Sequence, residues 1–416
     1  MFSRELALSL YLPAAMLSLG TGIVAPILPV YARTFDIGFG TAALILVVHA
    51  YGGLISNLPT GYLLDRFGRK PILVAGPLLT AIAAFLTAFL PFTGGFEELL
   101  VYRFISGAAA QMWFQARLTM IADVGGDRER GKLITWLAGT QRFGMLFSPV
   151  IGGLLGEWKL EAPFIVHGVL VLLVLLPIIK LAKETSPATS ETGEKRDVAD
   201  WRYVATAIWK PQILFFMASQ LFANVTRGQF AGIVGLYVAF EFAKGPQVIG
   251  LMAAGNAAIV MPLTFVTGIV MDRWGRKMTI VPGFFGLFVT SMLLAVAASS
   301  LVDTSFAVFL ALNFLWHAAQ GLTAGNMQVL GSDLAPPRAR GRFFAIQRTA
   351  GQGGQATSPL VFGLLSGISF AASFSFVGFS ALAVALIIAF KVKETVGRAR
   401  TSEPEPAAAP PPPTRT

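Results

Sequence analysis

The sequence has no cysteine, few histidines and little charge, and each shortage excludes a class of function. Without cysteine the chain holds no disulfide, thiolate metal site or iron–sulfur cluster. Its three histidines are too few for a recognisable metal cluster, so we expect no cofactor. Only 13% of its 416 residues are charged and 55% are hydrophobic, whereas soluble domains carry about 25% charged residues. These proportions predict an all-α polytopic membrane protein.

Twelve apolar stretches are each long enough to cross a bilayer, which takes roughly 17–25 residues. The first begins close to the N-terminus but exceeds the apolar core of a signal peptide, about 7–15 residues, so we expect it to remain as a helix. The twelve stretches lie at approximately 7–32, 42–64, 72–93, 98–122, 132–156, 162–181, 211–240, 246–271, 278–299, 305–332, 343–367 and 370–391.

One change in composition divides the chain, between the sixth and seventh stretches. Residues 182–210 begin with a polar segment and continue with aromatic and basic residues at helical spacing, a pattern that favours a helix on the membrane surface. After Lys393 the sequence turns to proline and alanine, which favours disorder. The predicted organisation is an N-terminal six-helix bundle (1–181), a cytoplasmic linker (182–210), a C-terminal six-helix bundle (211–394) and a disordered Pro-rich tail (395–416).

The net charge of +10 is distributed unevenly over the predicted loops. Loops on the side of the two termini hold most of the Lys and Arg residues, whereas the opposite loops hold Arg33, Lys159 and Lys244. Because positively charged loops stay in the cytoplasm, we expect both termini there. This distribution accounts for the basic excess, so we expect no nucleic-acid partner.

The two halves repeat short motifs at nearly one spacing. A loop after the second stretch recurs after the eighth, 207 residues later, and two further motifs recur after 210 residues. Three matched blocks at such similar spacing predict two related six-helix halves. The matched starting residues are Gly61 and Gly268, Asp123 and Asp333, and Gly144 and Gly354.

On these motifs the sequence resembles the major facilitator superfamily over essentially its whole length. The fifth stretch resembles the family's antiporter motif, with a serine where a glycine is usual, and residues 22–29 resemble its drug:proton antiporter branch. Arg103 with Gly107 resembles its second motif. The fifth-stretch residues are Gly144, Ser148, Pro149, Gly152 and Gly153. The loop residues are Gly61, Asp65, Arg66, Gly68, Arg69 and Lys70, repeated as Gly268, Asp272, Arg273, Gly275, Arg276 and Lys277.

The resemblance implies a fold of two pseudo-symmetric six-helix bundles in a bacterial inner membrane. It also implies that the loop motifs hold the outward-open state through contacts that break as the halves rock. In the first half, Arg66, Arg69 and Lys70 can pair with Asp123. The alternative is a purely topological role, in which the basic turns only stay inside.

The family resemblance implies that the first, fourth, seventh and tenth helices line a central cavity. Two of these stretches carry polar residues at i, i+4 and i+7, which places them on one face of a helix. The seventh has Gln220, Asn224 and Arg227, and the tenth has Asn313, His317 and Gln320. These polar stripes predict a wet cavity between the halves.

Five arginines lie within the predicted spans, and their central regions contain no Asp or Glu. Arg117 and Arg348 lie near the cytoplasmic end, where we expect them to snorkel to the interface. Arg103 matches a family motif. Arg142 and Arg227 lie near the middle of their helices without a carboxylate partner, although a central charge costs roughly 2.5–3.5 kcal/mol on insertion scales.

Central arginines without a carboxylate partner suggest that their counter-charge is a substrate, which binds and dissociates. We therefore expect Arg227, with Asn224, Gln220 and Arg142, to bind an anionic group of the substrate, which a guanidinium accepts bidentately. The alternative is that Arg142 and Arg227 bond backbone carbonyls and set helix packing.

The missing carboxylate also bears on energy coupling. The drug:proton branch often has a titratable carboxylate in its first half, and its absence here argues against polyspecific cation efflux. His317 is the central group that titrates in the physiological range. Proton coupling through His317 is therefore one alternative. The other is solute exchange or uniport, which needs no proton site.

The predicted function is secondary transport of a small organic solute by alternating access. We expect an exporter or exchanger of an anionic or amphipathic compound, with a proton-coupled multidrug exporter or a lipid or lysolipid translocator as alternatives. No phosphate-binding glycine loop, nucleophile elbow or paired-carboxylate site occurs, so we do not expect an enzyme. The bilayer and the solute are the expected partners, and a monomer suffices.

Overall fold

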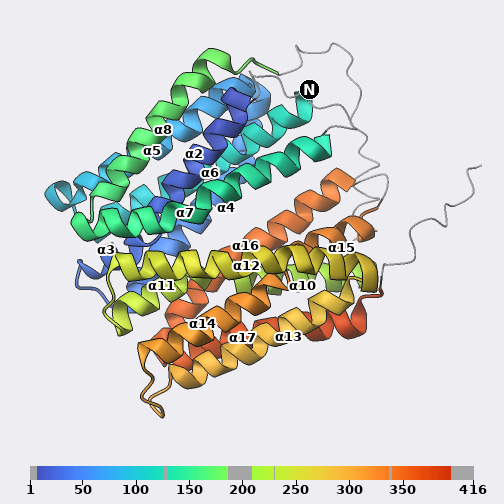
Figure 1. Ribbon diagram of the computed structural model, residues 1–416. Coiled ribbons are helices and arrows are strands. Elements are labelled where there is room, and N and C mark those ends of the chain that lie inside the picture. The colour runs from blue at the N-terminus through green and yellow to red at the C-terminus, as the bar shows by residue number, and fades with distance from the viewer. Residues whose placement is uncertain (1–6, 125–129, 186–208, 229, 337–339, 395–416) are drawn as a thin grey trace, which may run out of the picture.

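A computed structural model of the protein describes residues 7–124, 130–185, 209–228, 230–336 and 340–394 (Figure 1). Within these ranges the chain is helical and forms no strand, as the composition predicts. The first half, here called the N-half, contains η1 (Ala7–Tyr11, a π-helix), α2 (Leu12–Val24), α3 (Ile27–Arg33), α4 (Phe39–Phe67), α5 (Arg69–Thr93), α6 (Phe96–Val124), α7 (Arg130–Trp158) and α8 (Ala162–Leu181). The second half, the C-half, contains α10 (Pro211–Arg227), α11 (Phe230–Glu241), α12 (Pro246–Trp274), α13 (Lys277–Ala297), α14 (Phe306–Gly321), α15 (Asn326–Leu334), α16 (Arg340–Ser366) and α17 (Phe370–Lys391).

Three of the predicted spans are pairs of helices separated by a break. In the first span, Pro26 separates α2 from α3, because proline lacks the amide donor that continues a helix. In the seventh, α10 ends at Arg227 and α11 begins at Phe230. In the tenth, Gly325 separates α14 from α15 with φ +76°, a value that glycine adopts without strain. These three spans belong to the set that the sequence predicts around the cavity.

By length and apolar composition alone, eight of the described helices or helix pairs can cross a membrane. The long helices α6 and α16 fall outside this set because they carry polar residues. Two of those polar residues, Gln111 of α6 and Gln352 of α16, line a cavity inside the molecule that is described below. The predicted surface helix in the linker and the predicted disordered tail lie outside the described residues, apart from 182–185 and 209–210.

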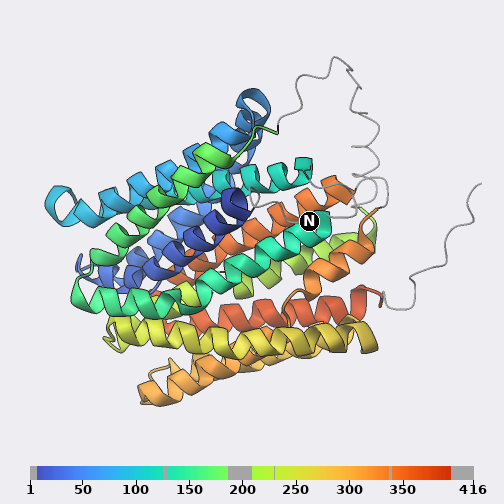
Figure 2. The ribbon, with the colours of Figure 1, turned by 45° about the horizontal axis from the view of Figure 1, so that its top comes forward.

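The bundle has two ends. The turns at Gly68 and Gly275 lie at one end, which we call the basic end, and both glycines have positive φ (+89° and +105°). The turns between α3 and α4 and between α11 and α12 lie at the opposite end, which we call the far end. The ribbons of the two halves come together toward the far end and diverge toward the basic end (Figure 1). In the rotated view the orange helix α16 of the C-half runs beside the blue and teal helices of the N-half (Figure 2).

Contacts between the halves close the far end. A Cβ on Gly40 of α4 would lie 2.9 Å from the carbonyl of Gly363 of α16, and a Cβ on Gly153 of α7 would lie 2.8 Å from the carbonyl of Pro246. Arg33 donates a hydrogen bond to the carbonyl of Ala239, 2.9 Å away, across the halves. Backbones that approach this closely require glycine, since any side chain would force the helices apart.

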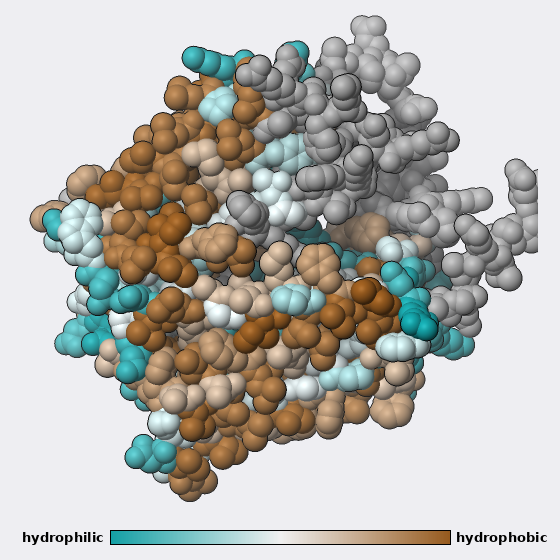
Figure 3. Space-filling view, in the orientation of Figure 1, coloured by the Kyte–Doolittle hydropathy of each residue, from teal (hydrophilic) through white to brown (hydrophobic). Residues whose placement is uncertain are grey.

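The outer surface is apolar. Large hydrophobic side chains such as Phe92, Phe265 and Phe390 are 84%, 68% and 78% exposed. Brown hydrophobic surface covers much of both halves, with a hollow between them where hydrophilic residues are visible (Figure 3). An exposed apolar face of this extent is stable in lipid and not in water, so the hydrophobic face marks the surface in contact with the bilayer.

Candidate substrate cavity

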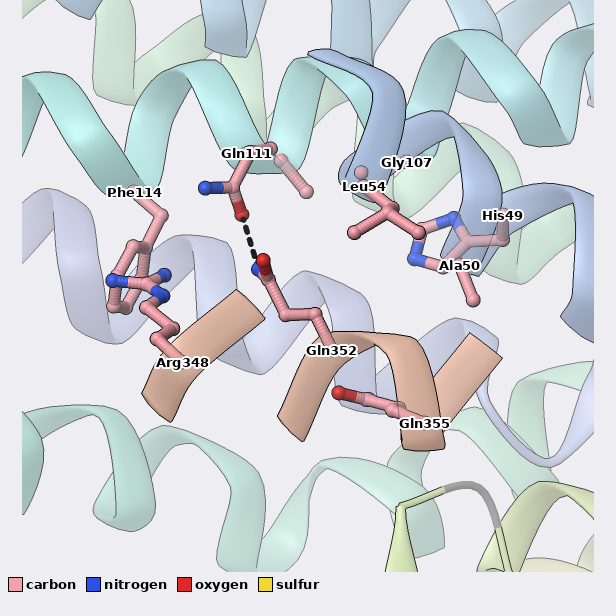
Figure 4. A pocket seen from close by; sticks show the side chains of 11 residues that line it. His49, Ala50, Leu54, Gly107, Gln111, Phe114, Arg348, Gln352 and Gln355 are labelled. Carbon is pink, nitrogen blue, oxygen red and sulfur yellow. Dashed lines mark hydrogen bonds between the residues drawn. The ribbon is translucent and has the colours of Figure 1, made fainter. Parts of the chain in front are cut away.

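A cavity of about 310 Å³ lies between the halves, where α4 and α6 of the N-half meet α16 of the C-half. Figure 4 shows side chains from the three helices pointing into it. The lining residues are His49, Ala50, Gly53, Leu54, Gly107, Ala110, Gln111, Phe114, Arg348, Gln352 and Gln355. No Asp or Glu occurs among them, so the wall of this cavity offers amides, one cation, one imidazole and apolar surface.

Three side-chain amides form a closed ring of hydrogen bonds across this cavity. Asn57 donates to the oxygen of Gln352 (2.6 Å), Gln352 donates to the oxygen of Gln111 (3.4 Å; Figure 4), and Gln111 donates to the oxygen of Asn57. Each amide thus donates once and accepts once within the ring. Gln115 adds a second donor to the Asn57 oxygen at 2.7 Å. We call Asn57, Gln111 and Gln352 the amide ring, and it joins the two halves through hydrogen bonds alone.

The side chains of Arg348 and Phe114 line the same cavity as the amide ring. The guanidinium carbon of Arg348 lies 4.1 Å from the centroid of the Phe114 ring, within the range of a cation–π contact. The contact again joins α16 to α6 across the halves. Arg348 is half-buried and lines the cavity, so it does not snorkel to the interface as expected from its position in the sequence. Arg117, with the same expectation, is fully buried near the Trp113 ring.

Arg227, the predicted anion anchor, is directed into the C-half. Its guanidinium donates to the carbonyl oxygen of Thr323 (3.0 Å) and to the hydroxyl of Thr323 (3.2 Å), and it lies 5.2 Å from the Phe284 ring. Thr323 lies in the break between α14 and α15, where carbonyls lose their helical partners. The same break is supported by Asn326, which donates to the carbonyl of Leu322 (3.0 Å). In this conformation Arg227 therefore bonds a backbone carbonyl within its own half, which agrees with the alternative that it sets helix packing.

The other predicted residues of the seventh helix lie close to α16. A Cβ on Gly351 would lie 3.0 Å from the Asn224 amide nitrogen and 3.4 Å from that of Gln220. The oxygen of the Gln220 amide is buried without a hydrogen-bond partner. Gln320 of the tenth helix is half-buried. The side chain of Arg142 lies outside the described residues.

The tenth-helix residues Asn313 and His317 are buried inside the C-half rather than on the cavity wall. Asn313 donates to Asn256 of α12 (2.8 Å), and Nδ1 of His317 lies 2.9 Å from the carbonyl of Asn313. The rings of Phe230 and Trp316 stack beside His317, with centroids 3.6 Å apart. Asn313 and His317 thus have their hydrogen-bond partners within their own half.

Arg103 lies on α6, the helix of the N-half that corresponds to the tenth span of the C-half. Its Nε is buried without a partner, and its positive charge acts on the imidazoles of His49 and His167. Nδ1 of His49 lies 3.3 Å from the carbonyl of Arg103. The cavity thus has His49 on its wall and Arg103 behind it.

The loop motif of the C-half forms an ion-pair network around Arg276. Arg276 bonds Asp272 at 2.9 Å and Asp333 at 3.2 Å, and it also donates to the carbonyl of Met271. In the N-half, Arg69 makes the matching bond to the carbonyl of Leu64, while Asp65 and Arg66 are exposed. The side chain of Asp123, the expected partner, lies outside the described residues.

Two glutamates beside the loop motifs were not singled out in the sequence. Glu184, after α8, accepts hydrogen bonds from the backbone amides of Arg69 (2.8 Å) and Lys70 (2.9 Å) at the start of α5. Glu394, after α17, accepts from those of Arg276 (3.0 Å) and Lys277 (2.9 Å) at the start of α13. A carboxylate satisfies the free amides of a helix N-terminus and favours its dipole. The signal was available, because Lys-Glu-Thr recurs at 183 and 393, again 210 residues apart.

The fifth-span motif is a packing surface. Its glycines contact backbone: a Cβ on Gly144 would overlap the carbonyl of Ala15, and one on Gly152 would overlap that of Ile23, both in α2. Ser148 is fully buried against Gly22. A Cβ on Gly250 of α12 would overlap the carbonyl of Pro149, which places the motif where the halves meet.

Two halves of membrane-crossing helices around a shared cavity define the class of the protein, which is a polytopic membrane transporter. The sequence profile described as Major Facilitator Superfamily matches residues 10–232 and, in a second match, residues 213–415. The chain belongs to the major facilitator superfamily. It is accordingly a multi-pass membrane transport protein and not an enzyme.

Curated relatives include bacterial drug-resistance proteins. The chain is 27% identical over 291 residues to "Tetracycline resistance protein, class B" of Escherichia coli, covering 68% of this chain and 70% of that protein. It is 25% identical over 252 residues to "Quinolone resistance protein NorA" of Staphylococcus aureus, covering 59% of this chain and 62% of that protein. The chain therefore resembles the drug:proton antiporter branch, as its motifs predict.

Solved structures share the fold over nearly the whole chain. A crystal structure of a D-xylose-proton symporter matches with a TM-score of 0.76 at 17% identity, covering 95% of this chain and 99% of that one. The inward open conformation of the xylose transporter XylE from E. coli matches with a TM-score of 0.72 at 20% identity, covering 95% and 97%. At these identities the match concerns the fold alone.

Proposed function

We propose that this transporter exports an amphipathic organic compound whose polar part is uncharged or anionic. The composition of the cavity wall carries the proposal. The amide ring lies beside Arg348 and Phe114, and no carboxylate occurs among the described lining residues. Amides bind uncharged donors and acceptors, a guanidinium binds carboxylate or phosphate, and an aromatic face binds apolar rings. A lipophilic cation finds no counter-charge on this wall.

The amide ring offers a way for such a compound to be recognised. A ligand with a hydrogen-bond donor and an acceptor at neighbouring positions can take the place of one amide in the ring. The bonds that join Gln352 to Asn57 and Gln111 are then exchanged for bonds to the ligand, so little hydrogen-bond energy is lost. Binding would thereby break the hydrogen bonds by which the amide ring joins the halves at the cavity.

Export is the proposed direction of transport, and the orientation of the bundle and the names of the relatives support it. We infer that the basic end faces the cytoplasm, since the described loops there carry the basic motifs. With the far end closed by the glycine contacts, this conformation would receive its ligand from the cytoplasmic side. The drug-resistance relatives favour export.

Proton-coupled efflux of several drugs is the second candidate, and the printed names of the tetracycline and quinolone relatives favour it. Anion binding at Arg227 stays a prediction. It requires the guanidinium to leave Thr323, which a second conformation can provide.

Accumulation in a bacterial host that lacks its own efflux pumps tests the proposal. Cells expressing the transporter would receive an anionic aromatic compound, tetracycline, a quinolone, a lysolipid and a lipophilic cation. We expect lower accumulation of the uncharged or anionic aromatic compounds, lost in Gln352→Leu and kept in Gln328→Leu, a matched change at an exposed glutamine of α15. Export of the lipophilic cation alone, unaffected by Gln352→Leu, would refute the proposal. Export of the lysolipid alone would assign the cavity to lipids instead.

A further inference from the structure

Arg117 of α6 places a positive charge in the interior of the N-half. Its side chain is fully buried, at 0% exposure. A guanidinium keeps its proton in a protein, so this charge persists. Arginine is almost never fully buried unless an opposite charge is beside it, but no carboxylate among the described residues acts on Arg117. Because the interior screens weakly, the charge acts beyond the side chains that Arg117 touches.

The side chains in contact with Arg117 are uncharged. With the amide of Gln141 of α7 turned so that its oxygen faces the guanidinium, both terminal nitrogens donate to that oxygen, at 3.3 and 3.1 Å. The guanidinium carbon lies 5.4 Å from the centroid of the Trp113 ring and 5.5 Å from that of the Phe114 ring. Nε has no hydrogen-bond partner. These contacts hold the side chain in place without neutralising it.

Phe114 connects Arg117 to the cavity. The Phe114 ring lines the cavity, and it also lies 4.1 Å from the guanidinium carbon of Arg348. One aromatic ring is thus within cation–π range of two guanidiniums, of which Arg348 lines the cavity and Arg117 is buried behind the wall. Like charges at such distances repel each other. An anion in the cavity beside Arg348 would therefore lower the energy of both.

The other buried or central arginines are placed differently. Arg227 bonds Thr323 inside the C-half. Arg103, on the same helix as Arg117, lies behind His49, fourteen residues earlier and thus roughly 21 Å further along the helix axis. Arg117 is therefore the described cation behind the part of the wall that Arg348 and Phe114 form.

From this geometry we propose that Arg117 determines the charge selectivity of the cavity. It touches no ligand and is a positioning residue, whose charge adds to that of Arg348 and gives the wall beside Phe114 a positive potential. Such a potential attracts carboxylates and phosphates and repels cations. The consequence for the transported compound rests on the proposed function, whereas the potential itself requires no substrate.

The reactivity of a single cysteine in the cavity measures this potential. Ala110 lines the cavity and is exposed to it, and the chain has no cysteine, so Ala110→Cys provides one thiol there. In nanodiscs this thiol would be reacted with two methanethiosulfonates of similar size, the anionic sulfonatoethyl and the cationic trimethylammonioethyl reagent. The ratio of the two rates, each divided by the rate with a free thiol, reports the potential, because changes in the thiol itself affect both rates. We expect the ratio to favour the anionic reagent.

Arg117→Gln and Arg117→Lys, each combined with Ala110→Cys, are the matched pair. Both keep a donor for Gln141, but lysine alone keeps the charge. Arg117→Gln should lower the ratio about tenfold, because a unit charge roughly 10 Å away acts with opposite sign on the two reagents, and Arg117→Lys should keep it. Leu301→Cys, 89% exposed at the far end, is the reference, and its ratio should not depend on Arg117.

An unchanged ratio in Arg117→Gln, an equal fall in Arg117→Lys, or a ratio that favours the cationic reagent before Arg117 is changed would overturn the proposal. Should Arg117→Gln fold poorly, Arg117→Met removes the charge with an apolar side chain, a replacement that is often neutral or stabilising at buried charges. The proposed function fails separately: a positive potential in a protein that no anionic or uncharged aromatic compound stabilises would refute that function and leave the role of Arg117 intact.

Discussion

Replacing Gln352 by leucine should weaken the conformation described here by a predictable amount. Leucine is similar in size but cannot bond, so Asn57 loses its acceptor at 2.6 Å and Gln111 loses its donor at 3.4 Å. Each net hydrogen bond contributes about 0.5–1.5 kcal/mol, which gives about 1–3 kcal/mol for the two, or about a 5–150-fold change in the conformational equilibrium. Because these bonds join the halves, the loss acts on conformation more than on folding of either half.

Distances between spin labels measure this shift. We would use the basic-end pair at Phe67 and Trp274, and a far-end pair at Phe92 and Leu301, which are 84% and 89% exposed. Gln352→Leu should shorten the basic-end distance and lengthen the far-end distance, as alternating access requires.

Gln115→Leu is the matched control for this prediction. It removes an amide bond to Asn57 at 2.7 Å, but this bond joins α6 to α4 within the N-half. We expect no shift. Equal shifts in Gln115→Leu and Gln352→Leu, or none in either, would refute the role of the amide ring as a connection between the halves.

Three further predictions follow from the packing and the loops. Gly250→Ala should open the far end, because its methyl group would overlap the carbonyl of Pro149, whereas Gly268→Ala in the same helix meets nothing within 4 Å and should change neither label distance. Glu394→Ala should lower the free energy of unfolding by about 1 kcal/mol, the typical loss for a helix cap, and more than Glu184→Ala, because Glu394 is the less exposed of the two; equal thermal shifts would contradict this. Arg227→Lys should lower stability by about 1.5–3 kcal/mol through its lost bonds to Thr323; an unchanged melting temperature with lost ligand binding would instead support the predicted anion anchor.

The sequence predicts the fold well because its signals are local or repeated. Apolar length defines the spans, and the 207- and 210-residue repeats define two related halves. The breaks in the first and tenth spans also have local causes, at Pro26 and Gly325. These features depend on neighbouring residues and not on how distant helices meet.

The cavity was predicted less well, because it depends on which helix faces which. Asn57, Gln111 and Gln352 come from three helices, and nothing in their spacing along the chain shows that their amides meet. The polar stripe of the tenth helix was expected on the cavity wall, but Asn313 instead donates a hydrogen bond to Asn256 of the same half. The prediction that Arg348 snorkels to the interface used only its position along the helix. In the structure its guanidinium contacts Phe114 of the other half.

A single measurement tests the central claim that this wall binds uncharged or anionic amphipathic compounds. Thermal unfolding of the purified protein would be followed with and without an anionic aromatic compound, an uncharged one and a lipophilic cation, in the parent and in Arg348→Gln. A ligand at about 100 times its Kd stabilises the native state by about 2.7 kcal/mol. The account predicts stabilisation by the anionic and uncharged compounds, with the anionic effect lost in Arg348→Gln. Stabilisation by the cation alone, equal in both proteins, would contradict it.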